Sequence, residues 1–275
     1  MLSPQEFTQA GIEWFGASEA AAAEARVLKL TISALEAAGL SKFRVTFGDL
    51  GLFSALLADT DMPKRWRKRL QHHFWRPHAF RDLLENFCAE RSARRTSISA
   101  MVDRVMDGDA LAIVEAELHS RALPFVGGRD MSEIAARLAG KAADRRETPL
   151  DRSKAEQLNA YLGISGDASA IGSALEKITG GAAYAAAREY YARRLFEMEE
   201  LGLNPRRFHF AADFGRELEY YTGFTFQIEA VARDGAIAVA GGGRYDNLLS
   251  DMGSAVAVPA VGCAIHTDRL KAVLA

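Results

Sequence analysis

FHFAADFGRELEYYTGFTF, residues 208–226, and AVAGGGRYD, residues 238–246, are the stretches from which the fold is predicted. Apolar residues alternate with other residues at both ends of the first stretch, and three glycines interrupt the second, which predicts strand, turn, strand, turn and strand. The first turn holds an arginine, two glutamates and two tyrosines. A pocket floor built on an antiparallel sheet would bring such residues together. Two hairpins with a tyrosine-rich rim are the alternative, and composition alone does not separate the two interpretations.

The overall composition is that of an ordinary globular protein. The chain has 275 residues, of which 49% are hydrophobic and 25% charged, and its formal net charge is −2. The length allows a large core, and the near-neutral charge offers no positive field to nucleic acid, so no nucleic-acid partner is expected. Two cysteines are too few for a disulfide framework. Neither a secretory signal nor a membrane-spanning apolar stretch is visible, so we expect a cytoplasmic protein with no membrane partner and no cofactor.

An early strand carries the first candidate binding residues. Residues 7–15 alternate, so that Gln9, Gly11 and Glu13 share one face. Gln9 and Glu13 then lie roughly 13 Å apart, with the side-chain-free Gly11 between them. This arrangement leaves room for a small ligand beneath two polar side chains. An edge strand with a solvated face is the alternative.

The rest of the chain divides into sheet and helix. A helix is predicted over 18–38, a strand over 43–47 and a turn over 48–51. Further helices are predicted at 53–58, 63–73, 79–88, 97–106, 109–120, 132–141, 152–162, 167–178 and 183–201. Strands return at 207–213, 223–231, 236–241 and 258–265, with short helices at 244–249 and 267–274. The pattern predicts an α+β protein whose sheet core comprises residues 1–51 and 203–275, with a large helical insertion at 52–202.

Three clusters invite a functional interpretation. The run at 64–69 (KRWRKR) would suit nucleic acid, with Trp66 as a stacking platform, but a short run in a neighbourhood that is not basic favours a solvated helix face. Histidines at 72, 73 and 78 have no carboxylate or thiol at ligand spacing beside them, so no metal site is expected. Arg269 stands in the first turn of the last predicted helix, where a guanidinium can reach a phosphate. A salt bridge to Asp268 or Asp246 is the alternative.

Three separated segments resemble histidyl-tRNA synthetases. Residues 5–16 (QEFTQAGIEWFG) look like the strand that ends the second signature motif of that family, and residues 216–223 (RELEYYTG) look like its histidine-binding motif. Residues 242–246 (GGRYD) and 259–269 resemble its glycine strand and third signature motif. Order and spacing agree in all three, over the sheet at both ends of the chain and not over the helical middle.

The resemblance implies a fold and a pocket. The fold is a class II aminoacyl-tRNA synthetase-like antiparallel sheet flanked by helices. In the pocket, Glu13 would meet the α-amino group of histidine with help from Gln9, Tyr221 would contact the imidazole and Arg216 would face the carboxylate, pairings that suit these side chains. The residues assigned to the histidine pocket are Gln9, Glu13, Arg216, Glu219, Tyr220, Tyr221 and Tyr245. The residues assigned to phosphate binding are Arg244 and Arg269.

Departures from the synthetase pattern separate this chain from the synthetases themselves. Glu217 stands where the family motif has glycine, Glu219 replaces aspartate, and residues 266–269 (HTDR) stand where the family has Gly-Leu-Glu-Arg. Four residues precede Gln5, where the first signature motif and an ATP-binding arginine are expected, and an anticodon-binding domain would follow Ala275. Amino-acid activation needs cationic groups on the triphosphate, which leaves adenylate formation without its usual residues.

One branch of the family lacks the anticodon domain: the regulatory subunits of ATP phosphoribosyltransferase. Residues 45–57 (VTFGDLGLFSALL) resemble that branch more than a synthetase. The resemblance implies a subunit that does no chemistry by itself, assembles with the short-form catalytic subunit, takes part in histidine biosynthesis and is associated with feedback by L-histidine. A histidyl-tRNA synthetase fragment or paralogue that forms an aminoacyl adenylate is the alternative. Without the first signature motif, we expect a monomer or a dimer formed by another surface.

Overall fold

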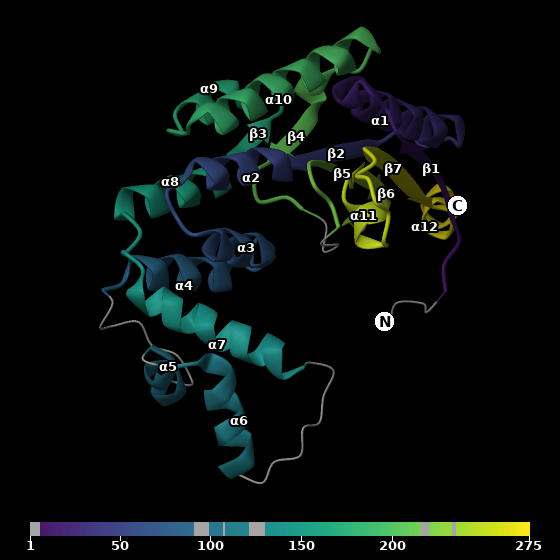
Figure 1. Cartoon of the computed structure of the whole chain (residues 1–275). Helices are drawn as coiled ribbons and strands as arrows, with labels where there is room; N and C mark the ends of the chain where they lie inside the picture. The colour runs from purple at the N-terminus through teal and green to yellow at the C-terminus, as the bar shows by residue number, and fades with distance from the viewer. Residues whose placement is uncertain (1–5, 91–98, 107, 121–129, 216–219, 233–234) are drawn as a thin grey trace. The chain divides into compact units, whose positions relative to one another are not determined.

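The computed structural model describes residues 6–90, 99–106, 108–120, 130–215, 220–232 and 235–275, and Figure 1 shows the course of the chain. The strands are β1 (Gln9–Phe15), β2 (Phe43–Asp49), β3 (Ser165–Asp167), β4 (Phe208–Ala211), β5 (Phe224–Ala232), β6 (Gly235–Arg244) and β7 (Ala260–His266). The longer helices are α1 (Ala20–Ala37), α2 (Leu50–Asp59), α3 (Lys64–His72), α4 (Pro77–Cys88), α5 (Ser99–Met106), α6 (Ala110–Ser120), α7 (Met131–Arg146), α8 (Arg152–Leu162) and α10 (Ala182–Glu200). The short helices are α9 (Gly172–Glu176), η2 (Pro205–Arg207), α11 (Leu248–Asp251) and α12 (Thr267–Leu274).

The described strands form one mixed sheet. Their order is β1-β7-β6-β5-β2-β4-β3, and every pair is antiparallel except β2 with β4, in which Val45 aligns with Phe208. The predicted synthetase-like sheet is confirmed, and the parallel pair of β2 with β4 makes the otherwise antiparallel sheet a mixed one. Parallel neighbours need a long crossover connection, and the many helices between β2 and β4 provide one.

Helices α1 and α10 lie side by side against one face of the sheet (Figure 1). Val27, Leu28 and Leu35 of α1 share one helical stripe and are fully buried. Tyr191 of α10 packs on Phe47 of β2, with ring centroids 6.4 Å apart. Helices α1 and α10 therefore cover this face of the sheet.

The segment predicted as a turn at 48–51 has no turn. Strand β2 continues through Asp49 and α2 begins at Leu50. The Asp49 side chain accepts hydrogen bonds from the N–H groups of Gly51 and Leu52, at 2.8 and 3.3 Å. An aspartate at this position satisfies N–H groups that a helix start leaves unpaired, so the chain changes from strand to helix without extra residues.

Strand β3 replaces the start of a predicted helix. The sequence predicts a helix over 167–178, whereas the structure has β3 paired with β4 and a helix only at Gly172–Glu176. Gly166 adopts a φ of 148°, which favours glycine. The Asp167 carboxylate accepts hydrogen bonds from the N–H and hydroxyl of Ser169, both at 2.8 Å. This local turn competes with the helix at its expected start.

The chain forms two compact units, and their bounds differ from the predicted domains. The first unit comprises Met1–Asp61, Gln71–Pro77 and Glu156–Ala275, and the second comprises Met62–Leu70 and His78–Ala155. Much of the predicted insertion at 52–202 thus belongs to the sheet unit. The physical reason is α10, which packs along α1 and α2 and buries Arg194 completely.

The second unit contains the basic run at 64–69. Trp66 is 1% exposed and stacks on Phe87, with centroids 4.2 Å apart and planes at 4°. Arg65 and Arg69 each contact Asp144 of α7, at 2.6 and 2.7 Å. Trp66 is therefore a core residue rather than a stacking platform for bases. The basic run was expected to form a solvated helix face, and two of its arginines form ion pairs.

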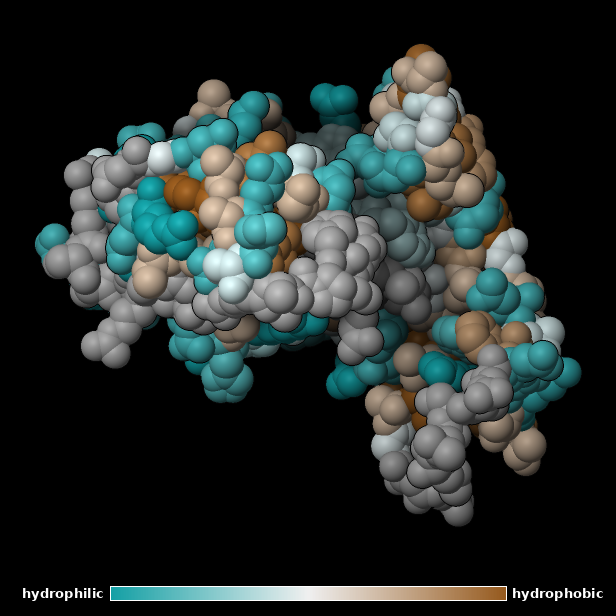
Figure 2. Space-filling model, turned by 60° about the horizontal axis from the view of Figure 1, so that its bottom comes forward, coloured by the Kyte–Doolittle hydropathy of each residue, from teal (hydrophilic) through white to brown (hydrophobic). Residues whose placement is uncertain are grey.

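A separate apolar cluster holds α5, α6 and α7 together within the second unit. Its buried members are Val102, Val105, Val114, Ala135, Leu138 and Ala142. Figure 2 shows hydrophobic residues in small groups among hydrophilic ones on the face turned to the viewer. Among the described residues, no helix combines the length and the apolar character that a bilayer crossing needs.

Candidate ligand-binding site

The sheet register places five residues in one row across five strands. Glu13 aligns with Gly262, Gly262 with Gly243, Gly243 with Thr225, and Thr225 with Gly48. Aligned residues of neighbouring strands point to the same face. A carboxylate and a hydroxyl therefore share a row whose three other members have no side chain, on the face away from α1 and α10. This row is the floor of the candidate site.

Tyrosines surround the Glu13 end of this floor. Tyr245, two residues after Gly243, donates a hydrogen bond from its hydroxyl to Oε2 of Glu13. The Tyr245 ring meets Tyr220 edge-on at 5.6 Å, and Tyr220 packs on Tyr221 at 4.4 Å. Burial, followed by the hydrogen bond to Glu13, raises the pKa of Tyr245, so its phenol stays a neutral donor at physiological pH.

Glu13 and Tyr221, from opposite ends of the chain, cover neighbouring positions of the floor. A Cβ atom added to Gly262 would collide with the Glu13 carboxylate. A Cβ atom on Gly243 would lie 2.9 Å from two ring carbons of Tyr221. Strands β7 and β6 are neighbours, about 4.8 Å apart, so the two side chains lie next to each other. Because both positions are glycines, the side chains of Glu13 and Tyr221 can lie directly against the backbone of the sheet.

The other predicted pocket residues are placed as follows. Gln9 is exposed, shares the face of Glu13 and aligns with His266 of β7. Tyr220 is half-buried and Tyr245 buried. Arg216 and Glu219 lie outside the described residues. The structure thus brings Glu13, Tyr220, Tyr221 and Tyr245 together, with Gln9 on the same strand face.

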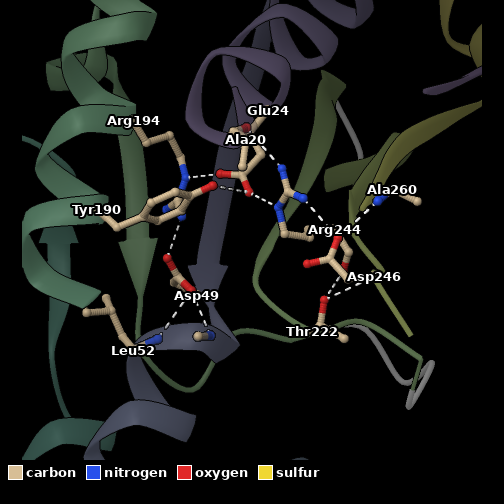
Figure 3. A network of polar contacts seen from close by, with 11 residues as sticks. Ala20, Glu24, Asp49, Leu52, Tyr190, Arg194, Thr222, Arg244, Asp246 and Ala260 are labelled. Atoms are coloured by element: carbon tan, nitrogen blue, oxygen red, sulfur yellow. Dashed lines mark hydrogen bonds and ion pairs between the residues drawn. The ribbon is translucent and has the colours of Figure 1, made fainter. Parts of the chain in front are cut away.

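The opposite face of the sheet carries a buried network of charges (Figure 3). Arg244 follows Gly243 in β6 and so points toward the helices. The Glu24 carboxylate of α1 contacts Nε of Arg244 and Nε of Arg194, and accepts a hydrogen bond from the Tyr190 hydroxyl at 3.0 Å. Glu24 and Arg194 are both 0% exposed. Burial alone lowers the pKa of Arg194, but the carboxylates of Asp49 and Glu24 outweigh burial and raise it.

The network also contacts two chain segments near the tyrosines. One is the start of α2 at Asp49, and the other includes Asp246. Arg194 Nη2 lies 2.7 Å from Oδ2 of Asp49, the residue that caps α2. Arg244 Nη1 lies 2.9 Å from Oδ1 of Asp246. The Asp246 N–H donates to the Thr222 hydroxyl at 3.1 Å, and the Thr222 N–H donates to the Arg244 carbonyl at 2.8 Å. Because Thr222 follows Tyr221, the buried charges hold the tyrosine segment in place.

The two predicted phosphate-binding arginines have other contacts. Arg244 is engaged by Glu24 and Asp246 on the helix-covered face, away from the floor of the site. Arg269 donates to the Ala238 carbonyl at 3.1 Å. The Asp268 carboxylate, one of its predicted salt-bridge partners, accepts from the N–H of Thr8 at 2.9 Å.

The charged network was not predicted from the sequence. Its signal was present in α1, where Glu24 stands among Ala21, Ala23 and Ala25 and is the one charged residue among the described buried residues of that helix. A carboxylate among such residues is buried only when it is paired, which predicts a cationic partner elsewhere in the chain. Among the described residues, no group of three or more histidines, cysteines and carboxylates is placed to hold a metal ion.

Comparisons with known proteins show which family the chain resembles. The sequence profile described as "Histidyl-tRNA synthetase" matches residues 1–121 and 113–270. The ATP phosphoribosyltransferase regulatory subunit of Mesorhizobium japonicum is 34% identical over 275 residues, covering 97% of this chain and 72% of the relative. The subunit of the same name from Brucella canis is 31% identical over 273 residues, with the same coverage.

A solved structure supports the fold. The crystal structure of an ATP phosphoribosyltransferase regulatory subunit/histidyl-tRNA synthetase from Bacillus halodurans has a TM-score of 0.65 and 21% identity, and the match covers 100% of this chain and 55% of that one. The fold class predicted from the three sequence segments and the family predicted from residues 45–57 and the departures from the synthetase pattern are both confirmed. The chain therefore belongs to the family of ATP phosphoribosyltransferase regulatory subunits, which has the histidyl-tRNA synthetase fold.

Proposed function

We propose that this chain is the non-catalytic regulatory subunit of ATP phosphoribosyltransferase in histidine biosynthesis and binds L-histidine on the floor described above. The observation that carries the proposal is the meeting of Glu13 with the three tyrosines on one sheet face. A carboxylate pairs with an ammonium group, and a phenol hydroxyl can hydrogen-bond a ring nitrogen. Gln9, Arg216 and Glu219 complete the proposed pocket.

The partner in this proposal is the short-form catalytic subunit, which this chain would activate in the cytoplasm. The relatives that share its family carry the name of a regulatory subunit. Histidine would exert feedback by favouring one arrangement of the complex, and typical coupling free energies are about 1–3 kcal/mol. By linkage, the catalytic subunit would change the affinity of this chain for histidine by the same factor.

The contacts of the arginines favour a binding protein over an adenylate-forming enzyme. Activation of an amino acid needs cationic groups on a triphosphate. Arg244 is engaged by Glu24 and Asp246, and Arg269, which is exposed, donates a hydrogen bond to a backbone carbonyl. Pyrophosphate exchange with ATP and histidine is the test, and measurable exchange would support the synthetase-like alternative instead.

Titration calorimetry with L-histidine tests the proposed pocket. Glu13→Gln keeps the shape of the side chain but removes its charge, so affinity should fall about ten- to hundredfold, as expected for a charged hydrogen bond. Glu199→Gln, an exposed residue at the end of α10, is the matched control and should bind as the native chain does. Imidazolepropionate, which lacks the ammonium group, should bind both Glu13 forms equally weakly. Absence of histidine binding to the native chain, or equal loss in the control, would contradict the proposal.

A further inference from the structure

A cavity of about 370 Å³ is lined in part by Tyr220 and Tyr221. Its walls come from α2, from residues 71–75, from residues 220–222 and from the turn that leads into α11, all within the first unit. Small-molecule sites in proteins typically have volumes of about 300–1,000 Å³. Glu13 and Gln9 are not among the described residues that line it, so the cavity is distinct from the row that forms the floor of the histidine pocket.

Aromatic rings from two distant segments form its walls. Phe53 and Phe74 pack with centroids 4.8 Å apart, and Trp75 meets Phe74 edge-on at 5.3 Å. Tyr220 and Tyr221 contribute the second aromatic pair. Walls of this kind favour a flat aromatic ligand, because stacking a base on an aromatic side chain contributes about 1–3 kcal/mol. The aromatic residues of the walls therefore favour a planar ring.

Neutral polar groups provide the means to recognise the edge of such a ring. Ser54 and Gln71 line the cavity and are joined by a hydrogen bond of 3.2 Å from Gln71 Nε2 to Ser54 Oγ. Asn247 lines the other end. Asparagine and glutamine amides each carry donors and an acceptor, and pair in bidentate fashion with the amino and ring nitrogens of adenine. The polar groups therefore suit a nitrogen heterocycle.

The charge of the described lining disfavours an anionic group in the ligand. Besides the two tyrosines, its titratable members are His72 and Asp251, no lysine or arginine stands among the described lining residues, and Asp251 contributes a carboxylate. A phosphate or carboxylate placed beside Asp251 would lie close to a like charge without the cationic partner that such groups usually have in proteins. A carboxylate can, however, accept hydrogen bonds from ribose hydroxyls.

We propose that this cavity binds an uncharged purine-type ring, presented as a free base or as a nucleoside. The proposal does not depend on histidine binding at Glu13. Because Tyr220 and Tyr221 form part of both sites, an occupied cavity places a ligand against the segment that covers the histidine floor. A purine in the cavity therefore changes the affinity for histidine.

Titration of the native chain with adenine, adenosine and AMP tests whether the cavity binds a purine. It also distinguishes a free base from a nucleoside. Adenine or adenosine should bind, with the tighter of the two identifying base or nucleoside, and AMP should bind at least about tenfold more weakly because of its phosphate. Failure of both adenine and adenosine to bind at millimolar concentration would overturn the proposal. AMP binding as tightly as adenosine would also overturn it.

Two variants locate the bound ring. Asn247→Ala should weaken adenine or adenosine binding about fivefold, the effect of one hydrogen bond, and its side chain makes no capping bond to α11 that the change would remove. Asn159→Ala, at an exposed position of α8, is the matched control and should have no effect. Ser54→Leu should block binding by filling the cavity, with circular dichroism to verify the fold.

Comparison of histidine binding with adenosine binding separates the purine proposal from the histidine proposal. Glu13→Gln should weaken histidine binding and leave adenosine binding within about twofold, so failure of the histidine proposal and failure of this one give different results. Complete displacement of adenosine by histidine, or equal loss of adenosine binding in Asn247→Ala and Asn159→Ala, would show that the cavity is not a separate site.

Discussion

Replacement of Glu24 perturbs the buried charges that hold the tyrosine segment. Glu24 and the Arg194 side chain are 0% exposed, and the Arg244 side chain is 8% exposed. After Glu24→Ala, each guanidinium loses one carboxylate and keeps another, Asp49 or Asp246. Removal of one partner from a buried ion pair costs about 3–5 kcal/mol. This cost is a large share of the roughly 5–15 kcal/mol that stabilises a folded domain.

Glu24→Gln should give a smaller effect, because the amide keeps one oxygen acceptor for two arginines. Loss of a charged hydrogen bond costs about 1.5–3 kcal/mol, so the expected order of stability is native, Gln, then Ala. If Glu24→Ala does not fold, Glu24→Gln still provides the measurement. Urea unfolding followed by circular dichroism gives the free energies, and hydrogen exchange in β2 and β6 shows whether the loss is in the first unit.

An exposed ion pair in the same sheet is the control for this experiment. Arg44 Nη2 lies 2.5 Å from Oε2 of Glu229, with the Arg44 side chain 58% exposed. Exposed pairs contribute about 0.2–1 kcal/mol, so Glu229→Ala should cost less than about 1 kcal/mol. A Glu24→Ala variant that loses no more stability than Glu229→Ala would refute the reasoning, since the buried carboxylate would then have no special role.

Three further predictions concern the glycine floor, the tyrosines and pH. Gly262→Ala should destabilise the chain and displace Glu13, because the added Cβ atom overlaps that carboxylate, whereas Gly140→Ala in α7 meets nothing within 4 Å and should stabilise by about 0.4–1 kcal/mol. Tyr245→Phe removes the hydroxyl that donates to Glu13, so histidine affinity should fall about fivefold; unchanged affinity would argue against a positioning role. Burial raises the pKa of Tyr184 to about 12, so above its unfolded pKa of about 10 the unfolded chain releases a proton that the folded chain keeps. Stability should then fall as the pH rises from about 10 through 12, less steeply in Tyr184→Phe, and a flat profile in urea unfolding would contradict the shift.

Local patterns in the sequence were sufficient for most elements of the fold and for one side of the site. The alternation around Glu13 and the glycines before Tyr245 predicted strands that the structure contains. Alternation assigns each residue to a face, and the antiparallel register then aligns Glu13 with Gly262. The proximity of Glu13 and Tyr221 was predicted from the family resemblance, because no local rule relates the two ends of a chain.

Contacts that depend on distant partners could not be predicted in the same way. Glu24 and Arg194 are 170 positions apart, and the pattern of either helix does not identify the other as its partner. The parallel pairing of β2 with β4 depends on how α10 returns the chain to the sheet. Asp49 was predicted in a turn because a strand and a helix are usually joined by loop residues, and here the strand runs directly into the helix without them. The bounds of the two compact units differ from those of the predicted insertion for a related reason. Helical period does not distinguish a helix that packs on a sheet from one that packs on other helices.

In the proposed pocket, Glu13 and Tyr221 act on one bound amino acid. A double-mutant cycle measures this directly, with histidine affinity determined by calorimetry for the native chain, Glu13→Gln, Tyr221→Phe and the combined variant. Residues that share a ligand couple by about 0.5–3 kcal/mol, so the combined loss should differ from the sum of the single losses by at least about 0.5 kcal/mol. Strictly additive losses, or no loss in either single variant, would contradict a shared site.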